Sequence, residues 1–307
     1  MQKQQNQLKG ALTLIVAAFI WGTAFVAQSV GMEFIGPFTF VAARSYIGAT
    51  FLSIIIFISH ILKKKKSQVQ EKSEEDKKKT PKTLLIGGAV CGTILCLASS
   101  LQQIGLQYTT VGKAGFLTAL YIVIVPIFGL FFGKKLNIKI ILSVIIALVG
   151  TYFLSIKDGF SISSGDLLVI ICAFLFSAHI IAIDHFSPKA DGIKLSCTQF
   201  IVCAVIATIV ALIFENPQFS AIFLAILPLL YAGVMSSGVA YTLQIMAQRR
   251  LNPAVACIIM SVESVFAAGA GWLILGQQLS TREILGCVLV FIAVIIAQIP
   301  KKDTSKL

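Results

Sequence analysis

PIFGLFFGKKLNIKIILS (residues 126–143) and GAGWLILGQQLSTREILG (residues 269–286) are two stretches of one chain that share a pattern. In both, a glycine, two polar residues and a leucine lie between apolar runs, and the two copies are 143 positions apart. Lys134 and Lys135 of the first copy are replaced by Gln277 and Gln278 in the second. The repeat and its loss of positive charge together predict the fold.

The composition of the chain is that of a membrane protein. Of its 307 residues, 57% are hydrophobic and only 12% are charged, whereas soluble domains carry about 25% charged residues. The mean hydropathy of +0.91 agrees. We therefore expect a polytopic helical membrane protein. The first apolar run is about 20 residues long, so it is interpreted as a retained helix and not as a cleaved signal.

Apolar runs long enough to cross a bilayer occur ten times along the sequence. The predicted spans are residues 9–30, 38–62, 83–105, 112–132, 138–156, 164–186, 194–214, 221–247, 253–275 and 281–299. One long connection, residues 63–82, contains a single apolar residue, Val69, so we expect it to be disordered in the cytoplasm. It is interpreted as a solvated topology signal, with binding to anionic lipid headgroups as the alternative.

The basic residues orient these spans. With the N-terminus in the cytoplasm, 21 of the 25 lysines and arginines lie inside and three, Lys113, Lys157 and Arg282, lie outside. This bias predicts a multi-pass plasma membrane protein with both termini in the cytoplasm. The net charge of +12 then reflects topology, and no nucleic-acid partner is expected.

The replacement of lysine by glutamine follows from this topology. Five spans separate the two copies, so the second copy enters the membrane upside down and its polar turn faces outward. The fold expected is all-α, with ten transmembrane helices in two inverted five-helix repeats, residues 1–157 and 158–307. Inverted repeats of this kind are typical of secondary transporters.

Four stretches resemble a known family. FIWGTAFVAQ (19–28) and VAARSYIGA (41–49) are similar to the first two helices of EamA-like proteins of the drug/metabolite transporter superfamily. Residues 239–286 resemble the most recognisable stretch of that family, and residues 102–126 are its counterpart in the first half. The family often has Glu-Pro in both halves, where this chain has Leu120–Tyr121 and Glu263–Ser264. Without those prolines, a kink at either point is in doubt.

The resemblance implies an alternating-access carrier of small organic molecules, often an exporter. Substrates in such families include amino acids, nucleotide-linked sugars, vitamins, quaternary amines and drugs. No ATPase domain is implied, and the chain contains no G-x-x-x-x-G-K-[ST] stretch.

Ionisable residues within the spans are candidate functional groups because charge inside a bilayer is costly. Glu263, near the middle of span nine, could take a proton or pair with a cationic substrate, or be a structural hydrogen-bond partner. Arg44 could bind a substrate carboxylate, although snorkelling to the headgroups or bracing of loops is the favoured interpretation. His179 lies five residues before Asp184, so the two do not share a helical face, and a proton relay through them is the weaker alternative.

Neutral polar and aromatic residues recur at helical spacing and predict a cavity. The stripes are Ser237, Tyr241, Gln244 and Gln248; Cys96, Ser99 and Gln103; Trp21, Phe25 and Gln28; and Thr118 with Tyr121. Interhelical hydrogen bonds, worth about 0.6 kcal/mol each, are the alternative use of such residues. The cavity is expected between spans one, three, four, six, eight and nine, with glycine pairs Gly88/Gly92 and Gly129/Gly133 allowing close helix packing.

The predicted substrate-binding residues are Trp21, Phe25, Gln28, Arg44, Gln103, Thr118, Tyr121, His179, Ser237, Tyr241, Gln244 and Glu263. The function predicted is secondary transport of amino acids, amines or related solutes, with export as the expected direction and protons or another ion as the coupling partner. Membrane lipid is the other partner, and the chain is a monomer or homodimer. We expect no cofactor and no metal, because the seven cysteines include no C-x-x-C pair and lie in apolar segments.

Two other classes stay open. A membrane enzyme acting on lipid-linked substrates would need clustered catalytic groups, and the cluster of Asp184, His185 and Asp191 near Lys189 lacks a recognisable spacing. A passive channel would show a continuous polar lining instead of short stripes. The chain is therefore predicted not to be an enzyme, and saturable flux stimulated by solute on the far side would separate carrier from channel.

Overall fold

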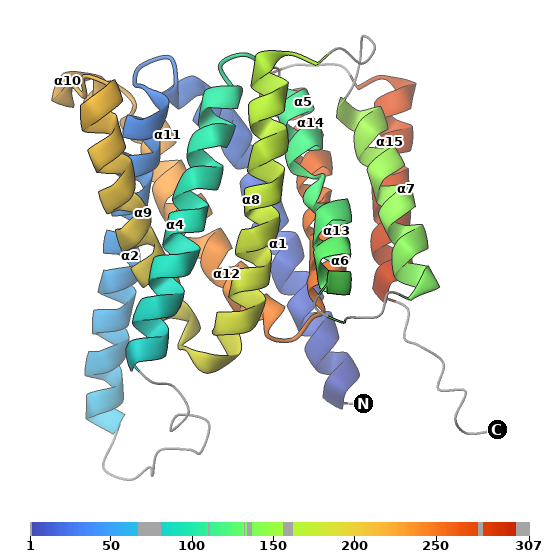
Figure 1. The fold of residues 1–307 in the computed structure, drawn as a ribbon, viewed down its shortest axis with the longest axis horizontal. Helices are drawn as coiled ribbons and strands as arrows, with labels where there is room; N and C mark the ends of the chain where they lie inside the picture. The colour runs from blue at the N-terminus through green and yellow to red at the C-terminus, as the bar shows by residue number, and fades with distance from the viewer. Residues whose placement is uncertain are drawn as a thin grey trace.

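The computed structural model describes residues 2–66, 81–109, 111–131, 133, 137–155, 162–275 and 279–298, which form a bundle of long helices without a strand among them (Figure 1). In these ranges nine helical segments of at least 18 residues are apolar enough to cross a membrane, and Ile138–Leu154 is a shorter apolar helix. They correspond to the ten predicted spans. The prediction of an all-α polytopic membrane protein is confirmed.

The first half contains five spans. Its helices are α1 (Gln2–Gly31), α2 (Pro37–Lys66), α4 (Pro81–Gly105), α5 (Val111–Thr118), α6 (Tyr121–Phe131) and α7 (Ile138–Ser155). The fourth span is thus two helices, α5 and α6. Most of the connection predicted to be disordered, residues 67–80, lies outside the described residues.

The second half also contains five spans. Its helices are α8 (Ser164–Phe186), η1 (Ser187–Lys189), α9 (Gly192–Phe214), α10 (Phe219–Leu224), α11 (Ile226–Leu230), the π-helix η2 (Tyr231–Ala240), α12 (Tyr241–Gln248), α13 (Pro253–Met260), α14 (Val262–Leu275) and α15 (Thr281–Gln298). The eighth span is therefore built from α11, η2 and α12, and the ninth from α13 and α14. The two polar pairs at 134–135 and 277–278 and the predicted boundary at 157/158 lie outside the described residues.

Side-chain caps explain where several helices of the second half begin. Ser163 and Asp166 form a reciprocal capping box at the start of α8. Asp191 accepts the backbone N–H groups of Ile193 and Lys194 at the start of α9. Asn252 caps α13, and Pro253 occupies the first helical position, where its missing N–H costs nothing.

The helices of the two halves run in opposite directions. In Figure 1, α1 rises from the end of the bundle at which α15 finishes, whereas its counterpart α8 descends toward that end. We call this end the inner end and the opposite one the outer end. Counterparts also pack on each other, α2 on α9 and α7 on α15. This antiparallel arrangement agrees with the expected inverted repeats.

Small residues allow close packing between the halves. A methyl group added at Gly92 of α4 would lie 2.5 Å from the backbone oxygen of Gln199 in α9, so the spacing of Gly88 and Gly92 does serve a helix contact. Gly133 has a different use, because its φ of 72° marks it as a turn residue and a side chain at this position would enter open space.

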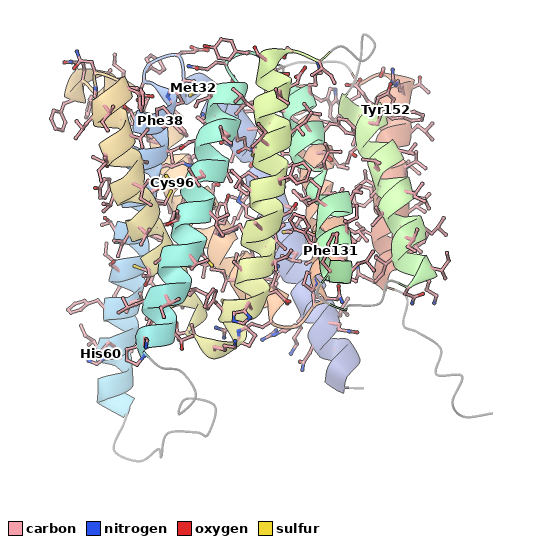
Figure 2. All side chains as sticks on the ribbon, in the orientation of Figure 1. Met32, Phe38, His60, Cys96, Phe131 and Tyr152 are labelled. Carbon is pink, nitrogen blue, oxygen red and sulfur yellow. The ribbon has the colours of Figure 1, made fainter. Side chains whose placement is uncertain are left out.

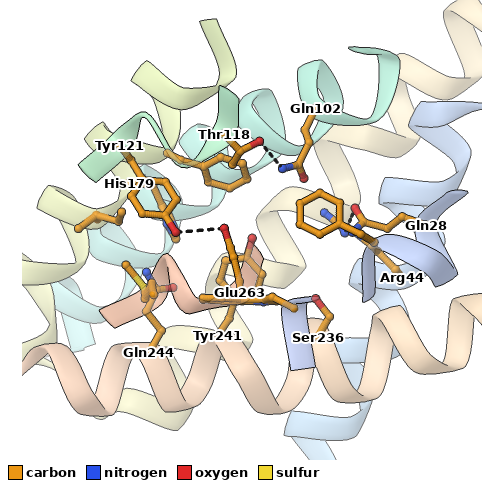
Figure 3. Close-up of a pocket in the computed structure, with 15 residues that line it drawn as sticks. Gln28, Arg44, Gln102, Thr118, Tyr121, His179, Ser236, Tyr241, Gln244 and Glu263 are labelled. Atoms are coloured by element: carbon orange, nitrogen blue, oxygen red, sulfur yellow. Dashed lines mark hydrogen bonds between the residues drawn. The ribbon is translucent and has the colours of Figure 1, made fainter. Parts of the chain in front are cut away.

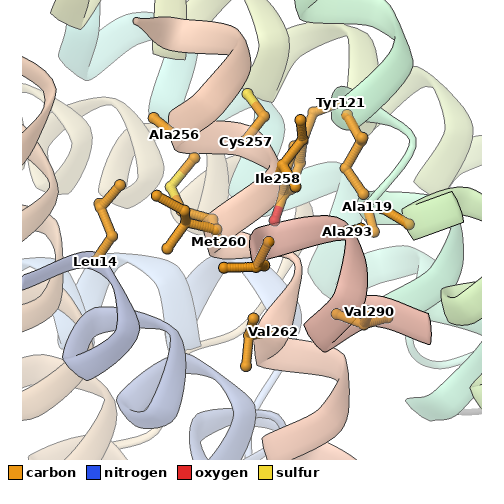
Figure 4. Packing of buried hydrophobic residues seen from close by; sticks show 14 of the residues in the cluster. Leu14, Ala119, Tyr121, Ala256, Cys257, Ile258, Met260, Val262, Val290 and Ala293 are labelled. Carbon is orange, nitrogen blue, oxygen red and sulfur yellow. The ribbon is translucent and has the colours of Figure 1, made fainter. Parts of the chain in front are cut away.

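The outside of the bundle is apolar, as a bilayer requires. Phe57, Leu212 and Leu273 are among the large hydrophobic side chains exposed on it. Figure 2 shows such side chains along the outer helices, with Phe131 near the inner end and Tyr152 near the outer end. Inside, a cluster of buried residues that includes Leu14, Ile258 and Val290 joins α1, α13 and α15 (Figure 4).

Spans four and nine are broken in the middle although neither break has a proline. At the first break, the N–H groups of Leu120, Ile122 and Val123 bond three residues back instead of four. At the second, the Ser261 hydroxyl donates to the Ile258 oxygen at 2.7 Å. Both spans are thus interrupted at these points without a proline, by tightened backbone turns in span four and beside serine hydroxyl bonds in span nine.

Candidate functional site

A central cavity of about 60 Å³ lies in the bundle at the depth of the two helix breaks (Figure 3). Its lining residues are Trp21, Phe25, Gln28, Arg44, Gln102, Thr118, Tyr121, Phe176, His179, Ile180, Ser236, Tyr241, Gln244, Met260 and Glu263. They come from spans one, two, three, four, six, eight and nine. Pockets that hold organic ligands usually measure about 300–1,000 Å³, so this conformation encloses only a small hollow.

Ten of the twelve predicted site residues line this cavity. They are Trp21, Phe25, Gln28, Arg44, Thr118, Tyr121, His179, Tyr241, Gln244 and Glu263. The six spans expected to form the cavity all contribute, and span two adds Arg44. The structure brings these residues together, while their contact with a substrate stays a prediction.

Gln103 and Ser237 do not line the cavity, and their neighbours Gln102 and Ser236 do. Gln102 Nε2 donates to the Thr118 hydroxyl at 3.1 Å, whereas Gln103 Nε2 donates to the backbone oxygen of Gln28 at 3.4 Å. Ser237 lies against α2, where a methyl group on Gly48 would come within 2.8 Å of its Cβ.

The shift from Ser237 to Ser236 has a physical cause in the π-helix η2. The Tyr241 N–H donates to the oxygen of Ser236, five residues back, instead of four. A stripe read at the spacing of an α-helix therefore selects the wrong serine.

Glu263 is the acidic group of the cavity, and it lies directly after the helix break at Ser261. Its side chain is buried, with 6% of the residue exposed. The Tyr121 hydroxyl, which follows the corresponding break in span four, donates to Glu263 Oε1 at 3.0 Å. Within the described residues this is the single hydrogen bond of the Glu263 carboxyl, and no ion pair reaches it.

Arg44 is the basic group of the cavity. It is 4% exposed, and its Nη1 donates to Gln28 Oε1 at 3.2 Å. Its Nε has no hydrogen-bond partner among the described residues. The buried guanidinium lines the cavity and does not reach the headgroups, so snorkelling is not found in this structure, while the favoured structural role of Arg44 stays a prediction. Figure 3 places Arg44 beside Gln28 on one side and Glu263 beside Tyr121 on the other.

Aromatic rings also line the cavity. The Trp21 and Tyr241 ring centroids are 4.9 Å apart at an interplanar angle of 66°, and Phe200 packs on the same tyrosine at 5.4 Å. Edge-to-face contacts of this kind are favourable, so they hold the Trp21 and Tyr241 rings against each other beside the cavity.

His179 faces the cavity and is separate from Asp184 and His185. Its Nε2 lies 3.1 Å from Gln199 Oε1. Asp184 and His185 line a second hollow, which we call the inner cleft, of about 680 Å³ at the inner end between α6, α8 and α13. A proton relay from His179 to Asp184 therefore has no direct path in this structure.

Metal-binding geometry is not found in the part of the chain that the structure describes, where no three His, Cys, Asp or Glu residues lie close enough to hold an ion. All seven cysteines are free thiols, and six of them are buried. Their packing role agrees with their apolar surroundings.

The sequence model of the EamA-like transporter family matches residues 8–156 and again residues 163–298. The chain belongs to the EamA-like transporter family. The two matches cover one half each, so both halves of this EamA-like protein resemble the same family model. Membership identifies the chain as a multi-pass membrane transporter in general terms.

Related proteins extend over nearly the whole EamA-like chain. It is 29% identical over 304 residues to an uncharacterized transporter of Archaeoglobus fulgidus, covering 97% of this chain and 90% of that one. It is 26% identical over 292 residues to the uncharacterized transporter YoaV of Bacillus subtilis, covering 92% and 94%. A protein of known crystal structure matches with a TM-score of 0.73 at 17% identity, over 94% of this chain and 96% of that one, which shows a shared fold.

Proposed function

We propose that this protein is a secondary carrier that exports amino acids, amines or related small solutes by alternating access. The observation that carries the proposal is a buried cavity that is lined by one acid, Glu263, one arginine, Arg44, and the aromatic rings of Trp21 and Tyr241. A zwitterion placed there would put its ammonium group near Glu263 and its carboxylate near Arg44. Because the cavity is small, it must widen on one side of the membrane to admit such a solute.

Unused hydrogen-bonding atoms in the cavity support a polar solute. Among the described residues, Trp21 Nε1, Arg44 Nε and Gln244 Oε1 are buried without a partner. A buried polar group left unsatisfied costs about 1–3 kcal/mol. A solute that offers both donors and acceptors would recover that cost, whereas a hydrocarbon would not.

Glu263 is the candidate for ion coupling. A carboxylate at this depth in a membrane is expensive unless it is neutralised. A proton or a cationic solute can neutralise it, and competition between the two at one carboxyl would couple solute export to proton uptake. Protons are therefore the coupling ion that we propose.

The charges at the two ends support a cytoplasmic inner end. Lys189, Lys194, Arg249 and Arg250 lie beside the inner ends of α8, α9 and α12, whereas Lys113 and Arg282 are the basic residues at the outer ends of α5 and α15. Positive residues favour the cytoplasmic side. We place both termini in the cytoplasm and the protein in the plasma membrane.

Transport by purified protein in liposomes tests the proposal. A library of amino acids and amines is first screened for thermal stabilisation, and each hit is then assayed for flux. Flux should saturate and should rise when unlabelled solute is present on the far side, as a carrier requires and a passive channel does not. Glu263→Gln should abolish the response of that flux to a pH gradient while retaining exchange. A pH response equal to that of the unchanged protein would exclude Glu263 as the coupling group.

A further inference from the structure

The inner cleft reaches toward the central cavity from the inner end of the bundle. Its mouth carries Asp184, His185 and Lys189, where Lys189 Nζ lies 2.9 Å from His185 Nε2. Its deeper wall is apolar and includes Val125 and Ile181. Water and polar solutes can therefore enter the mouth, and apolar side chains close the far end.

A thin layer separates the inner cleft from the cavity. On α6, Tyr121 lines the cavity and Val125 lines the cleft, and four residues span about 6 Å along a helix. On α8, the neighbours Ile180 and Ile181 line the cavity and the cleft respectively. Tyr121, Ile122, Val125, Ile180, Cys257 and Ile258 belong to one buried cluster. The barrier is thus about one helical turn of mainly apolar side chains.

The helices that carry this barrier are short and separated from the rest of their spans. α6 is the inner half of span four and α13 is the inner half of span nine, and each adjoins a break at the depth of the cavity. Pro126 inside α6 has no N–H, so the carbonyl of Ile122 loses its usual helical partner. Both segments therefore adjoin a point beside the cavity at which a helix can bend.

The outer end is held by polar contacts between the halves. Asp166 of the second half accepts from Lys113 Nζ at 2.5 Å and from the Thr109 hydroxyl at 2.6 Å, both in the first half. Glu215 of the second half accepts the N–H groups of Phe38 and Thr39, each at 2.8 Å. These contacts tie the halves together at the outer end, while the cleft opens at the inner end.

We propose that the inner cleft is the aqueous route between the inner side of the membrane and the central cavity, and that α6 and α13 are the gate. The proposal rests on the proposed carrier function and adds the route and the moving parts. The solute passes a charged mouth first and an apolar barrier second, which suits a small polar molecule that is soluble in water.

Cysteine labelling in oriented vesicles tests this route without any knowledge of the solute. Ser236→Cys places a thiol in the cavity wall, and peptide mass spectrometry measures its reaction with a membrane-impermeant thiosulfonate added to one side at a time. Ala182→Trp, in the wall of the cleft, fills the route with a large side chain. We expect labelling of the cavity thiol from the inner side, and loss of that labelling when Ala182→Trp is added.

Ala89→Trp is the matched control, because Ala89 is an exposed alanine on the outside of α4, and it should leave labelling unchanged. Ala178→Trp is a second plug in case Ala182→Trp fails to fold, which size-exclusion profiles will show. Inner-side labelling that survives both plugs, or labelling from the outer side alone, would overturn the proposed route. That result would leave the proposed transport standing. Absence of flux in liposomes would instead count against the carrier function, and the labelling result would stay valid.

Discussion

Tyr121 and Glu263 form the hydrogen bond on which the acidic side of the cavity depends. Tyr121→Phe keeps the ring and removes the donor to the Glu263 carboxyl. The buried carboxyl is then unsatisfied, so we expect a loss of about 1–3 kcal/mol in stability and a changed pH dependence of transport. Chemical unfolding and flux measured across a pH series check this expectation. Tyr152→Phe is the control, because no hydrogen bond to its hydroxyl is found among the described residues and its ring packs on Phe116 outside the cavity.

Substitution of Arg44 tests which solutes the cavity accepts. If it binds a carboxylate, Arg44→Gln should weaken the binding of an amino acid by about 2–5 kcal/mol. The corresponding amine, which lacks the carboxylate, should lose much less binding free energy. The ratio of the affinity for the amino acid to the affinity for the amine should therefore fall. Arg282→Gln removes an arginine that stacks on Tyr152 at 5.2 Å and lies away from the cavity, and it should not change the ratio. Equal losses for both solutes would show that Arg44 acts only in packing.

Most individual site residues can be predicted because charge and polarity are rare inside a bilayer. Their charge alone predicts Glu263, Arg44 and His179 as site residues. The position of Trp21 in a polar and aromatic stripe predicts Trp21. Gln102 cannot be distinguished from its neighbour, since two adjacent glutamines give no sign of which one faces the cavity. Apolar lining residues carry no sequence signal in an apolar span.

At the scale of the element, the two broken spans are the feature that the sequence does not reveal. Span lengths follow from apolar runs, but the breaks depend on hydrogen bonds within single turns. The Ser264 hydroxyl donates to the Ser261 oxygen at 2.6 Å, and the Ser264 N–H donates to the same oxygen at 3.2 Å, three residues back instead of four. The π-helix η2 is hidden for the same reason, because its register depends on backbone bonds and not on composition.

The serines at the break in span nine can be tested directly. Ser261→Ala with Ser264→Ala removes both hydroxyl donors, so the helix is expected to lose roughly 1–2 kcal/mol of stability and transport to slow through changed movement of α13. Thermal unfolding and flux rates check this. Ser143→Ala removes a comparable hydroxyl bond, from Ser143 to the Lys139 oxygen at 2.8 Å in the unbroken α7, and should affect flux less. A flux reduced equally by both changes would mean that the break has no special role.

At the scale of the whole molecule, the repeat explains both the shape and the asymmetry of the protein. The five spans of one half run antiparallel to those of the other (Figure 1), so each broken span has a counterpart, and Tyr121 and Glu263 meet beside the two breaks. The halves differ at their ends, where the second half supplies the carboxylates that hold the outer end. An inverted repeat can then switch between two conformations when contacts at one end give way to contacts at the other.

The contacts that Asp166 and Glu215 make at the outer end should determine which side of the cavity is open. Asp166→Asn and Glu215→Gln together weaken the bonds to Lys113, Thr109 and Thr39, and hydrogen bonds to charged groups are worth about 1.5–3 kcal/mol each. We expect a cavity thiol at Ser236→Cys to become reactive from the outer side and less reactive from the inner side. Impermeant reagents in oriented vesicles measure both rates.

Asp191→Asn is the control for that experiment, because Asp191 lies at the inner end and accepts from the backbone of its own helix, at Ile193 and Lys194. It should leave the outer rate unchanged. If the outer-end variant folds and its labelling stays on the inner side, the carboxylates serve only local stability, and the conformational balance must be set by the apolar contacts between α7 and α15 or between α2 and α9. Substitutions at Gly150 and Gly286, whose backbones pack closely between α7 and α15, would then be the next place to shift it.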